Sequence, residues 1–425
     1  MDWLLRDFAV IDGTNSPPFR GDVLIRGGVI AGVAAAGQLP VPGSASLVLN
    51  GRGSWLTPGL INCHEHLLNK EMHDLSPGLE TRAWRMDLRS RPAGYQALVS
   101  ARNARRVLQQ GVTTVREMAG PHVDDIRDPP FTNIDLRDAI KDGLDGPRVL
   151  ACRLAVSMTG GHGYPWYATR PADGCDEARK AVREQLKGGA DFIKVMASAG
   201  LANFPHEDPL CDELSVAEME VIVEEAHRRR KLVAAHALSD HAARKAVSAG
   251  VDSIEHGFFL GTDTLRLMRE KGTALVPTVM VATRLADVRT DALGELLRGA
   301  LPGHREVVRS ALQQGIPVGV GTDSRFTMAE EMVALLEYGL SPGEVLNAAT
   351  AAAARICGLH RVGTLEEGNA ADLVVLGSNP LEDLGRAFRD VRIVIRDGVV
   401  QVPSCASSKL VEEVCSELLS SSKAG

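Results

Sequence analysis

The stretch PGLINCHEH at residues 58–66 contains two histidines, two positions apart, that follow an apolar run over residues 57–62. In an extended chain such residues point the same way, so His64 and His66 can present both imidazoles to one point. Imidazole is a common ligand of zinc and similar divalent ions. Two solvated surface histidines could have the same spacing. The position of this pair directly after an apolar strand makes a metal site the alternative to consider.

Seven more short apolar runs follow this stretch, with helical patterns between several of them. Continuous apolarity over four to eight residues is typical of parallel strands that are covered on both faces. We expect these further strands at 112–117, 148–154, 192–197, 232–236, 253–256, 274–278 and 318–323. Eight strand–helix units in one series favour an α/β fold of the closed (β/α)₈ TIM-barrel type over a doubly wound sheet.

Local signals place the helices between the strands. The segments SVAE at 215–218 and SPGE at 341–344 are capping boxes, which open helices. Glycines 111, 250, 272 and 315 stand where a helix would end before the next strand, as C-capping glycines do.

Both ends of the chain read differently from the middle. Residues 1–55 and 363–402 show strand-like alternation with hairpin glycines and no convincing helix. We therefore predict one small composite β-sandwich domain built from both termini, a barrel over 56–362, and a C-terminal tail over 403–425.

The bulk composition excludes several classes of function. The 425 residues carry a net charge of −7, which gives no broad basic surface for nucleic acid. No run of about 18 apolar residues suggests a membrane span, and no signal peptide is visible. The seven cysteines are scattered and odd in number, as expected of reduced thiols in the cytoplasm. We expect a cytoplasmic homo-oligomer without nucleic-acid or membrane partners.

Four more polar residues stand in or at the ends of the later predicted strands. His236, His256 and Asp323 each end one of them, and Lys194 lies within an otherwise apolar one. A lone histidine at a strand end is usually a satisfied structural residue. A buried lysine without a partner is costly, however, and six such groups at the same end of barrel strands predict a metal site.

These motifs together resemble the amidohydrolase superfamily over about residues 5–400. They are PGLIxxHxH at 58–66, FIKVMASAG at 192–200, AHA at 235–237, IEHG at 254–257 and GTDS at 321–324. IKVMASAG, the loop TGGHG at 159–163 and the closing GTLEEGNAADLVVL at 363–376 look closest to the Xaa-Pro dipeptidase-like and imidazolonepropionase-related members.

The resemblance implies a role for each of the six groups. His64, His66 and Asp323 would hold one divalent metal ion, and His236 and His256 a second, with zinc expected for both. Lys194, carboxylated by CO₂, would bridge the two ions. A metal-bridging hydroxide would attack the carbonyl carbon, and Asp323 would act as general base and then general acid.

The resemblance also suggests substrate contacts. His162 resembles a family histidine near the scissile carbonyl, although a surface loop histidine is the alternative reading. Leu214 stands where dipeptidase-like relatives often have tyrosine, and Asn62 where many relatives have aspartate. Together with Phe204, Phe258 and Phe259, Leu214 is expected to make the pocket mouth apolar, which favours an aromatic or hydrophobic amide. Arg82, Arg85 and Arg89 are either solvated or able to meet a carboxylate.

The expected function is therefore that of a binuclear metal-dependent hydrolase of a small-molecule amide, such as an N-acyl amino acid, a dipeptide or an aromatic amide. A hydrolase of a cyclic amide (lactam or imidazolone), a carbamate or a urea is the enzymatic alternative. A non-catalytic barrel scaffold is the alternative from another class, and it would be expected to lose metal ligands.

Overall fold

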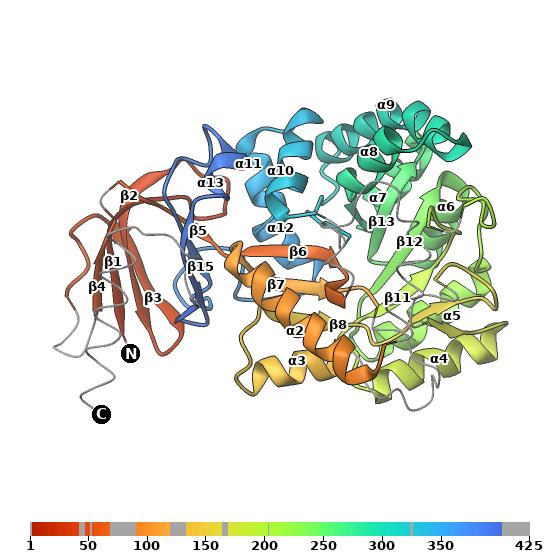
Figure 1. Cartoon of the computed structure of the whole chain (residues 1–425), viewed down its shortest axis with the longest axis horizontal. Coiled ribbons are helices and arrows are strands. Elements are labelled where there is room, and N and C mark those ends of the chain that lie inside the picture. Colours follow the sequence, from red (N-terminus) through yellow and green to blue (C-terminus); the bar gives the residue numbers. More distant parts are fainter. Residues whose placement is uncertain are drawn as a thin grey trace.

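A computed structural model describes residues 2–41, 47–51, 53–68, 91–119, 133–163, 169–202, 204–323 and 326–401. The predicted tail over 403–425 lies outside these residues, as do Arg82, Arg85 and Arg89. An eight-stranded sheet occupies one end of the molecule, and parallel strands with their helices occupy the other (Figure 1).

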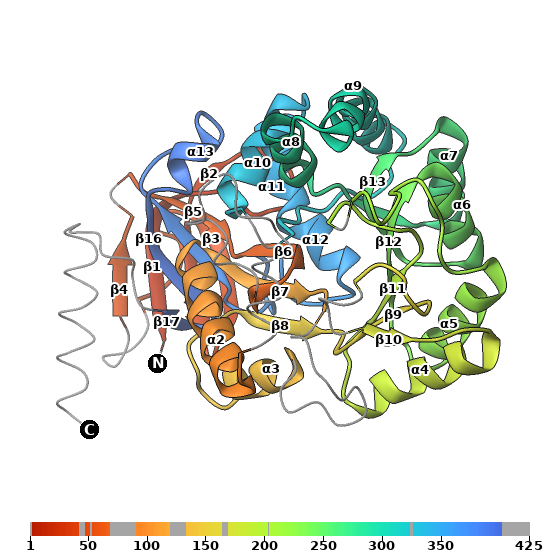
Figure 2. The same ribbon diagram turned by 45° about the vertical axis from the view of Figure 1, so that its right-hand side comes forward.

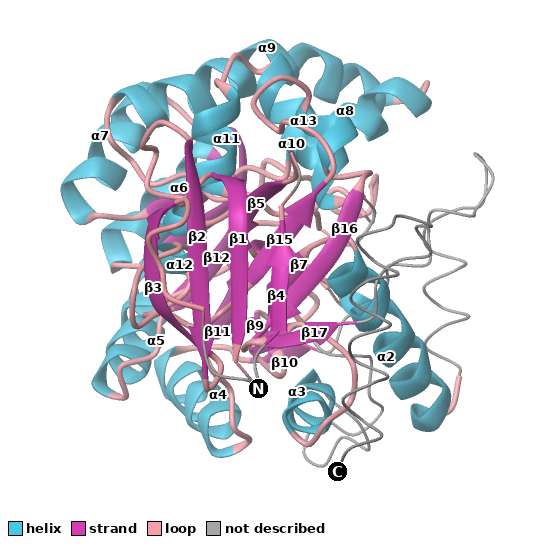
Figure 3. Ribbon diagram, turned by 90° about the vertical axis from the view of Figure 1, so that its left-hand side faces the viewer, coloured by secondary structure: helices cyan, strands magenta, loops and turns pink. Residues whose placement is uncertain are grey.

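The eight-stranded sheet is built from both termini (Figure 3). Its strands are β1 (Trp3–Val10), β2 (Phe19–Arg26), β3 (Val29–Ala35), β4 (Leu47–Asn50), β5 (Trp55–Pro58), β15 (Leu373–Leu376), β16 (Val391–Arg396) and β17 (Val399–Gln401). They follow the order β17-β16-β15-β5-β1-β2-β3, with β4 paired to β1. Strand β15 has two buried faces: Leu373 and Val375 join the core of this sheet, while Val374 and Leu376 join the larger core beyond it.

The remaining strands form two parallel sheets. One has the order β6-β7-β8 and the other β10-β9-β11-β12-β13-β14. Their bounds are β6 (Leu60–Glu65), β7 (Val112–Glu117), β8 (Arg148–Ala151), β9 (Ala155–Ser157), β10 (Thr169–Pro171), β11 (Ile193–Met196), β12 (Val233–Ser239), β13 (Ser253–Phe259) and β14 (Ala274–Val276). An α/β fold is thus confirmed.

The segment 318–323 lies between the two parallel sheets. The Gly319 amide donates to the Leu275 carbonyl of β14 at 2.9 Å, and the Cys63 amide of β6 donates to the Val320 carbonyl at 2.8 Å. The prediction of a regular strand over 318–323 is wrong, because Val318 alone in this segment forms a β-bridge, to Leu275.

Helices cover the outside of the parallel strands, as α4 to α9 show in Figure 2. The helices are α2 (Ala93–Gln109), α3 (Asn133–Lys141), α4 (Cys175–Lys187), α5 (Val216–Arg228), α6 (Asp240–Ala249), α7 (Thr262–Lys271), α8 (Val279–Val288), α9 (Ala292–Gln313), α10 (Met328–Glu337), α11 (Pro342–Ala348), α12 (Ala351–Ile356) and α13 (Leu384–Ala387). Both predicted capping boxes are confirmed, at Ser215 and Ser341. Within the described part of the chain, no helix combines the length and the apolarity that a membrane crossing needs.

The first predicted strand is divided in the structure. Instead of one strand over 57–62, β5 ends at Pro58 in the terminal sheet and β6 begins at Leu60 in a parallel sheet. The chain changes sheets at Gly59, where an added Cβ would lie 2.1 Å from the Thr113 hydroxyl oxygen. Only glycine allows this close approach. Strand β6 runs to Glu65 and carries His64 within it.

Glu225 joins α4 to α5 and gives the fold a pH-dependent contribution. Hydrogen bonds from Arg183, with help from Arg179 and Arg228, lower the pKa of Glu225 to about 2. A depressed pKa stabilises the fold above the unfolded value near 4.3, and the contribution is lost as the pH falls through the folded value.

We therefore expect Glu225→Gln to lower the free energy of unfolding by about 1 kcal/mol at pH 7, after screening by solvent. Urea unfolding should show the difference shrinking as the pH falls from about 4.5 towards 2. Glu224→Gln is the matched control, because Glu224 is exposed on the same helix and should contribute little. A Glu225→Gln deficit that does not change over this pH range would contradict the assignment.

Candidate metal centre and active site

The six polar groups singled out in the sequence meet in one cavity. His64 comes from the end of β6 and His66 directly follows that strand. Lys194 comes from β11, His236 from β12, His256 from β13 and Asp323 from the end of the 318–323 segment. All six line one cavity, which is partly open to solvent. Parallel strands bring these groups together because their carboxyl ends meet on one side.

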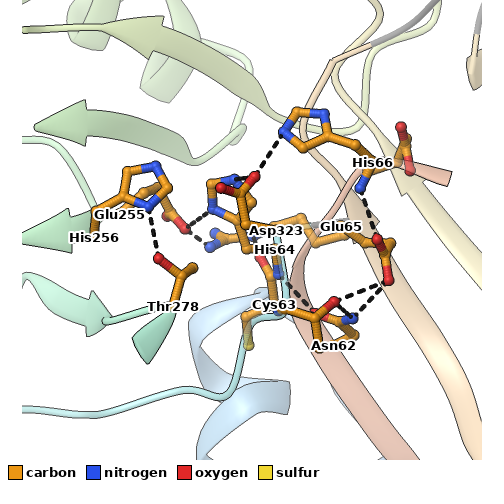
Figure 4. A network of polar contacts seen from close by, with 12 residues as sticks. Asn62, Cys63, His64, Glu65, His66, Glu255, His256, Thr278 and Asp323 are labelled. Atoms are coloured by element: carbon orange, nitrogen blue, oxygen red, sulfur yellow. Dashed lines mark hydrogen bonds and ion pairs between the residues drawn. The ribbon is translucent and has the colours of Figure 1, made fainter. Parts of the chain in front are cut away.

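Asp323 lies between the two histidines of β6 (Figure 4). Its Oδ1 is 3.4 Å from the Nε2 of His64 and 3.3 Å from the Nε2 of His66. Ligand atoms of His64, His256 and Asp323 all lie within 4.8 Å of one another. The rings of His236 and His256 are 4.6 Å apart, centroid to centroid. His64, His256 and Asp323 could therefore hold a metal ion.

The backbone is strained where these side chains are placed. His256, Thr278 and Asp323 adopt φ values of +73°, +44° and +48°, in the left-handed region that residues with side chains rarely adopt. Such conformations persist only where the surrounding structure holds them, and they cluster at functional sites. His256 adopts this conformation within β13, and Asp323 at the end of the 318–323 segment, and both side chains line the cavity.

Burial prepares the histidines for metal binding. It lowers the pKa of His66 and holds the pKa of His236 and His256 well below the ordinary value. These imidazoles are therefore neutral at pH 7, which is the form that ligates metals. Although burial opposes it, contact with His64 and His66 holds the pKa of Asp323 well below its usual range. Neutral imidazoles around a carboxylate are a donor set that fits a divalent cation.

Lys194 is the least ordinary member of the group. It is 2% exposed, and its Nζ has no hydrogen-bond partner among the residues that the structure describes. Burial lowers the pKa of Lys194 to about 8. An orphaned ammonium group in a core is costly, so this amine is prepared to lose its charge or to be modified.

A second layer of side chains orients the histidines. Glu255, buried in β13, lies 2.8 Å from the Nδ1 of His64, and the Thr278 hydroxyl lies 2.7 Å from the Nδ1 of His256. Both contacts leave the Nε2 atoms directed towards the cavity. Arg116 donates to Glu255 at 2.8 Å. The sequence reasoning missed Glu255, and the only signal was a charged residue inside an apolar strand.

Asn62 supports His64 through the backbone. Its side-chain oxygen accepts from the His64 amide at 3.1 Å, and its nitrogen donates to Glu65 at 3.0 Å and to the Thr322 hydroxyl at 2.8 Å. Glu65 thus joins this network behind the ligands and not the metal centre. The substitution of asparagine for the aspartate of many relatives leaves His64 with a defined hydrogen-bonded support.

His162 stands beside the metal centre and lines the cavity. Its ring stacks on His236 at 4.4 Å, and its Nδ1 lies 2.7 Å from the Oε2 of Glu207. The His162 amide also donates to Glu213 at 2.6 Å. Burial raises the pKa of Glu213 to about 7. These contacts set one face of the His162 ring on His236, a candidate ligand, at the lining of the cavity.

The prediction that Leu214 contacts substrate is wrong. Leu214 is 1% exposed and packs in the main hydrophobic core, away from the cavity lining. Leu214 follows Glu213, whose carboxylate accepts from the His162 amide. The side chain of Leu214 points to the other side of the chain from that of Glu213. Of the four residues expected to make the pocket mouth apolar, Phe258 lines the cavity, together with Leu201, Leu238, Val281 and Leu285. Phe204 and Phe259 pack behind that wall.

Comparison with known proteins decides the family. A model described as the amidohydrolase family matches residues 55–401. The chain belongs to the amidohydrolase family. Ochratoxinase of Aspergillus niger is 30% identical over 420 residues, which cover 91% of this chain and 83% of that protein. A crystal structure of A. niger ochratoxinase matches with a TM-score of 0.82 at 27% identity, over 96% of both chains.

Two further relatives agree with the predicted resemblance. The crystal structure of a Xaa-Pro dipeptidase with bound methionine has a TM-score of 0.79 at 26% identity and covers 94% of this chain and 100% of that one. Imidazolonepropionase of Ectopseudomonas mendocina is 27% identical over 424 residues, covering 92% of this chain and 95% of that protein. Membership of the family is thus confirmed, and this protein is a hydrolase that acts on amide carbon–nitrogen bonds.

Gly200 provides a steric test of the His162 position. A Cβ added there would lie 1.9 Å from the Cε1 of His162. We expect Gly200→Ala to displace the ring and to lower kcat/KM by roughly 100-fold, the scale of a misplacement of about 1 Å. The matched control is Gly299→Ala, in a helix and with nothing near its added Cβ, which should leave kcat/KM unchanged. Equal activity of the two variants would argue against a role for His162.

Glu255 provides a test of the second layer. We expect Glu255→Gln to weaken metal binding by roughly 10- to 100-fold, because the charged partner of the His64 ring is lost. Competition with a chelator measures this affinity. Glu220→Gln, an exposed change of the same kind on α5, should leave it unaltered. Unchanged metal affinity in Glu255→Gln would contradict the orienting role.

Proposed function

We propose that this protein hydrolyses an amide bond of a small molecule, an N-acyl amino acid, a dipeptide or an aromatic amide, with two divalent metal ions as cofactors. One observation carries the proposal: four histidines, an aspartate and a buried lysine from separate strands line a single cavity. We also propose that the parallel strands close into a (β/α)₈ barrel, with the terminal sheet as a separate composite domain.

The chain offers a ligand set for each ion. His64, His66 and Asp323 would hold one, His236 and His256 the other. The donors suit zinc. Lys194 would bridge both ions as a carbamate, formed when its neutral amine adds CO₂. In support, Lys194 is buried without a hydrogen-bond partner among the described residues, and its lowered pKa favours the neutral amine. When bound, the ions would activate water and polarise the substrate carbonyl.

The remaining chemistry falls to side chains of this chain. The Asp323 carboxylate is placed to take a proton from the attacking water and to pass it to the leaving amine. His162, whose Nδ1 contacts Glu207, would contact the substrate near its carbonyl. Leu238 and Phe258 cover the side of the cavity next to His256, and this wall excludes water and favours an apolar group.

A cyclic amide is the second candidate substrate. The similarity to imidazolonepropionase supports it, since that relative matches over nearly the whole chain. The ligand set would serve either substrate, so the shape of the cavity and not the metal chemistry separates the two. The apolar wall of Leu201, Val281 and Leu285 favours an open-chain amide with an apolar group.

A substrate screen with the metal-loaded protein tests the proposal. It should include N-acyl aromatic amino acids, Xaa-Pro dipeptides, lactams, imidazolones, carbamates and ureas. We expect the highest kcat/KM for open-chain amides that carry an aromatic or large aliphatic group. Faster turnover of small polar dipeptides such as Ala-Pro, or of the cyclic compounds, would contradict the proposed substrate class.

The role of Lys194 has a test that does not depend on the substrate. We expect Lys194→Ala to reduce the metal content from about two ions per chain and to abolish hydrolysis. In protein equilibrated with ¹³C-bicarbonate, ¹³C NMR should show a carbamate signal that is absent from Lys194→Ala. Lys194→Arg is a control that retains a cation and cannot form the carbamate. A fully metallated, active Lys194→Ala protein would refute the bridging role.

A further inference from the structure

Helix α8 links the metal centre to a guanidinium at the rim of the cavity. Thr278, just before the helix, contacts His256, and Arg289 is the residue at the C-terminal end of the helix. Val281, Leu285 and Arg289 are spaced four residues apart, so they lie along one face of α8. All three line the cavity. This face therefore offers two apolar side chains followed by a positive charge.

An ion pair with Asp291 fixes the orientation of the Arg289 side chain. Its Nε donates to the Oδ1 of Asp291 at 2.9 Å, and its Nη2 contacts the other oxygen of that carboxylate. Its Nη1 has no hydrogen-bond partner in the described part of the chain. Asp291 itself accepts from the Gly294 amide and caps α9, so the pair is anchored to a helix. One edge of the guanidinium is thus left for a ligand.

A second arginine adds to the positive charge. Arg298 donates to the carbonyl oxygens of Ala286 at 2.6 Å and Arg289 at 2.8 Å, at the end of α8. This contact places a cation beside Arg289 and offsets the charge of Asp291. The other cation among the described lining residues is Lys194, which belongs to the metal centre. Arg289 is therefore the group there that can meet an anion of the substrate.

We infer that Arg289 binds a carboxylate of the substrate, so that the preferred substrates are amides with an apolar body and a free carboxylate. The inference rests on the proposed function and narrows it to N-acyl amino acids, dipeptides and related acids. A guanidinium binds a carboxylate through charge-assisted hydrogen bonds, and Val281 and Leu285 would contact the apolar body in between. Neutral aromatic amides and ureas would lack this contact.

Binding of matched ligand pairs tests the inference apart from turnover. The pairs are N-benzoyl-L-phenylalanine with N-benzoyl-L-phenylalaninol, and 4-benzamidobutanoate with 4-benzamidobutanol, which place the carboxylate at two distances from the amide. Calorimetry on the metal-loaded protein should show at least about tenfold tighter binding of the acid in one pair, the scale of a charged hydrogen bond.

The variants separate an anchoring role from a structural one. Arg289→Gln should remove the preference for the acid, Arg289→Lys should retain part of it, and Arg284→Gln, the same loss of charge on an exposed position of α8, should retain all of it. Asp291→Asn keeps a helix-capping side chain and removes the competing carboxylate, so the acid should bind several-fold more tightly. A merely structural ion pair would not give that gain.

No preference for the acid in either pair, or a preference that survives Arg289→Gln, would overturn the inference. The proposed function fails in a different way. If the acids bind through Arg289 and no amide is hydrolysed, the hydrolase proposal is contradicted and the inference stands. Rapid hydrolysis without any effect of Arg289→Gln on the preference for acids contradicts the inference alone.

Discussion

Burial of Lys194 in the apolar strand β11 is the constraint on which the rest of the site depends. A charged amine with no partner cannot be held cheaply in a core, and burial already lowers its pKa to about 8. Loss of its proton, or conversion to the anionic carbamate proposed above, would remove this cost. The surrounding histidines are kept neutral by the same burial, which is the form that binds metal cations.

The parallel strands bring the other ligand-type side chains to the cavity that Lys194 lines. Because their carboxyl ends meet, His64, His236 and His256 reach one cavity from different strands, and Glu255 and Thr278 fix two of the rings from behind. The positive φ values of His256, Thr278 and Asp323 show where packing holds the backbone in strained conformations. On this account the rim of the cavity selects the substrate, because α8 presents an apolar face there and the Arg289 guanidinium follows it.

Much of this was predictable from the sequence, since periodicity and capping are local. Strand β7 matches its predicted range, and both capping boxes are present. The exchange of sheets at Gly59 was not predictable, because it depends on contact with Thr113, a residue distant in sequence. The direction of Leu214 was not predictable for a related reason: resemblance to a family gives a position in the sequence and not the direction of a side chain. Glu255 and Arg289 act through contacts that only the folded chain reveals.

The most direct test is anomalous diffraction from crystals of the metal-loaded protein. The account predicts two peaks, one among His64, His66 and Asp323 and one beside His236 and His256, with density for a carboxylated Lys194 between them. Peaks elsewhere, or no peak together with an unmodified Lys194, would contradict the metal centre from which every functional step above is argued.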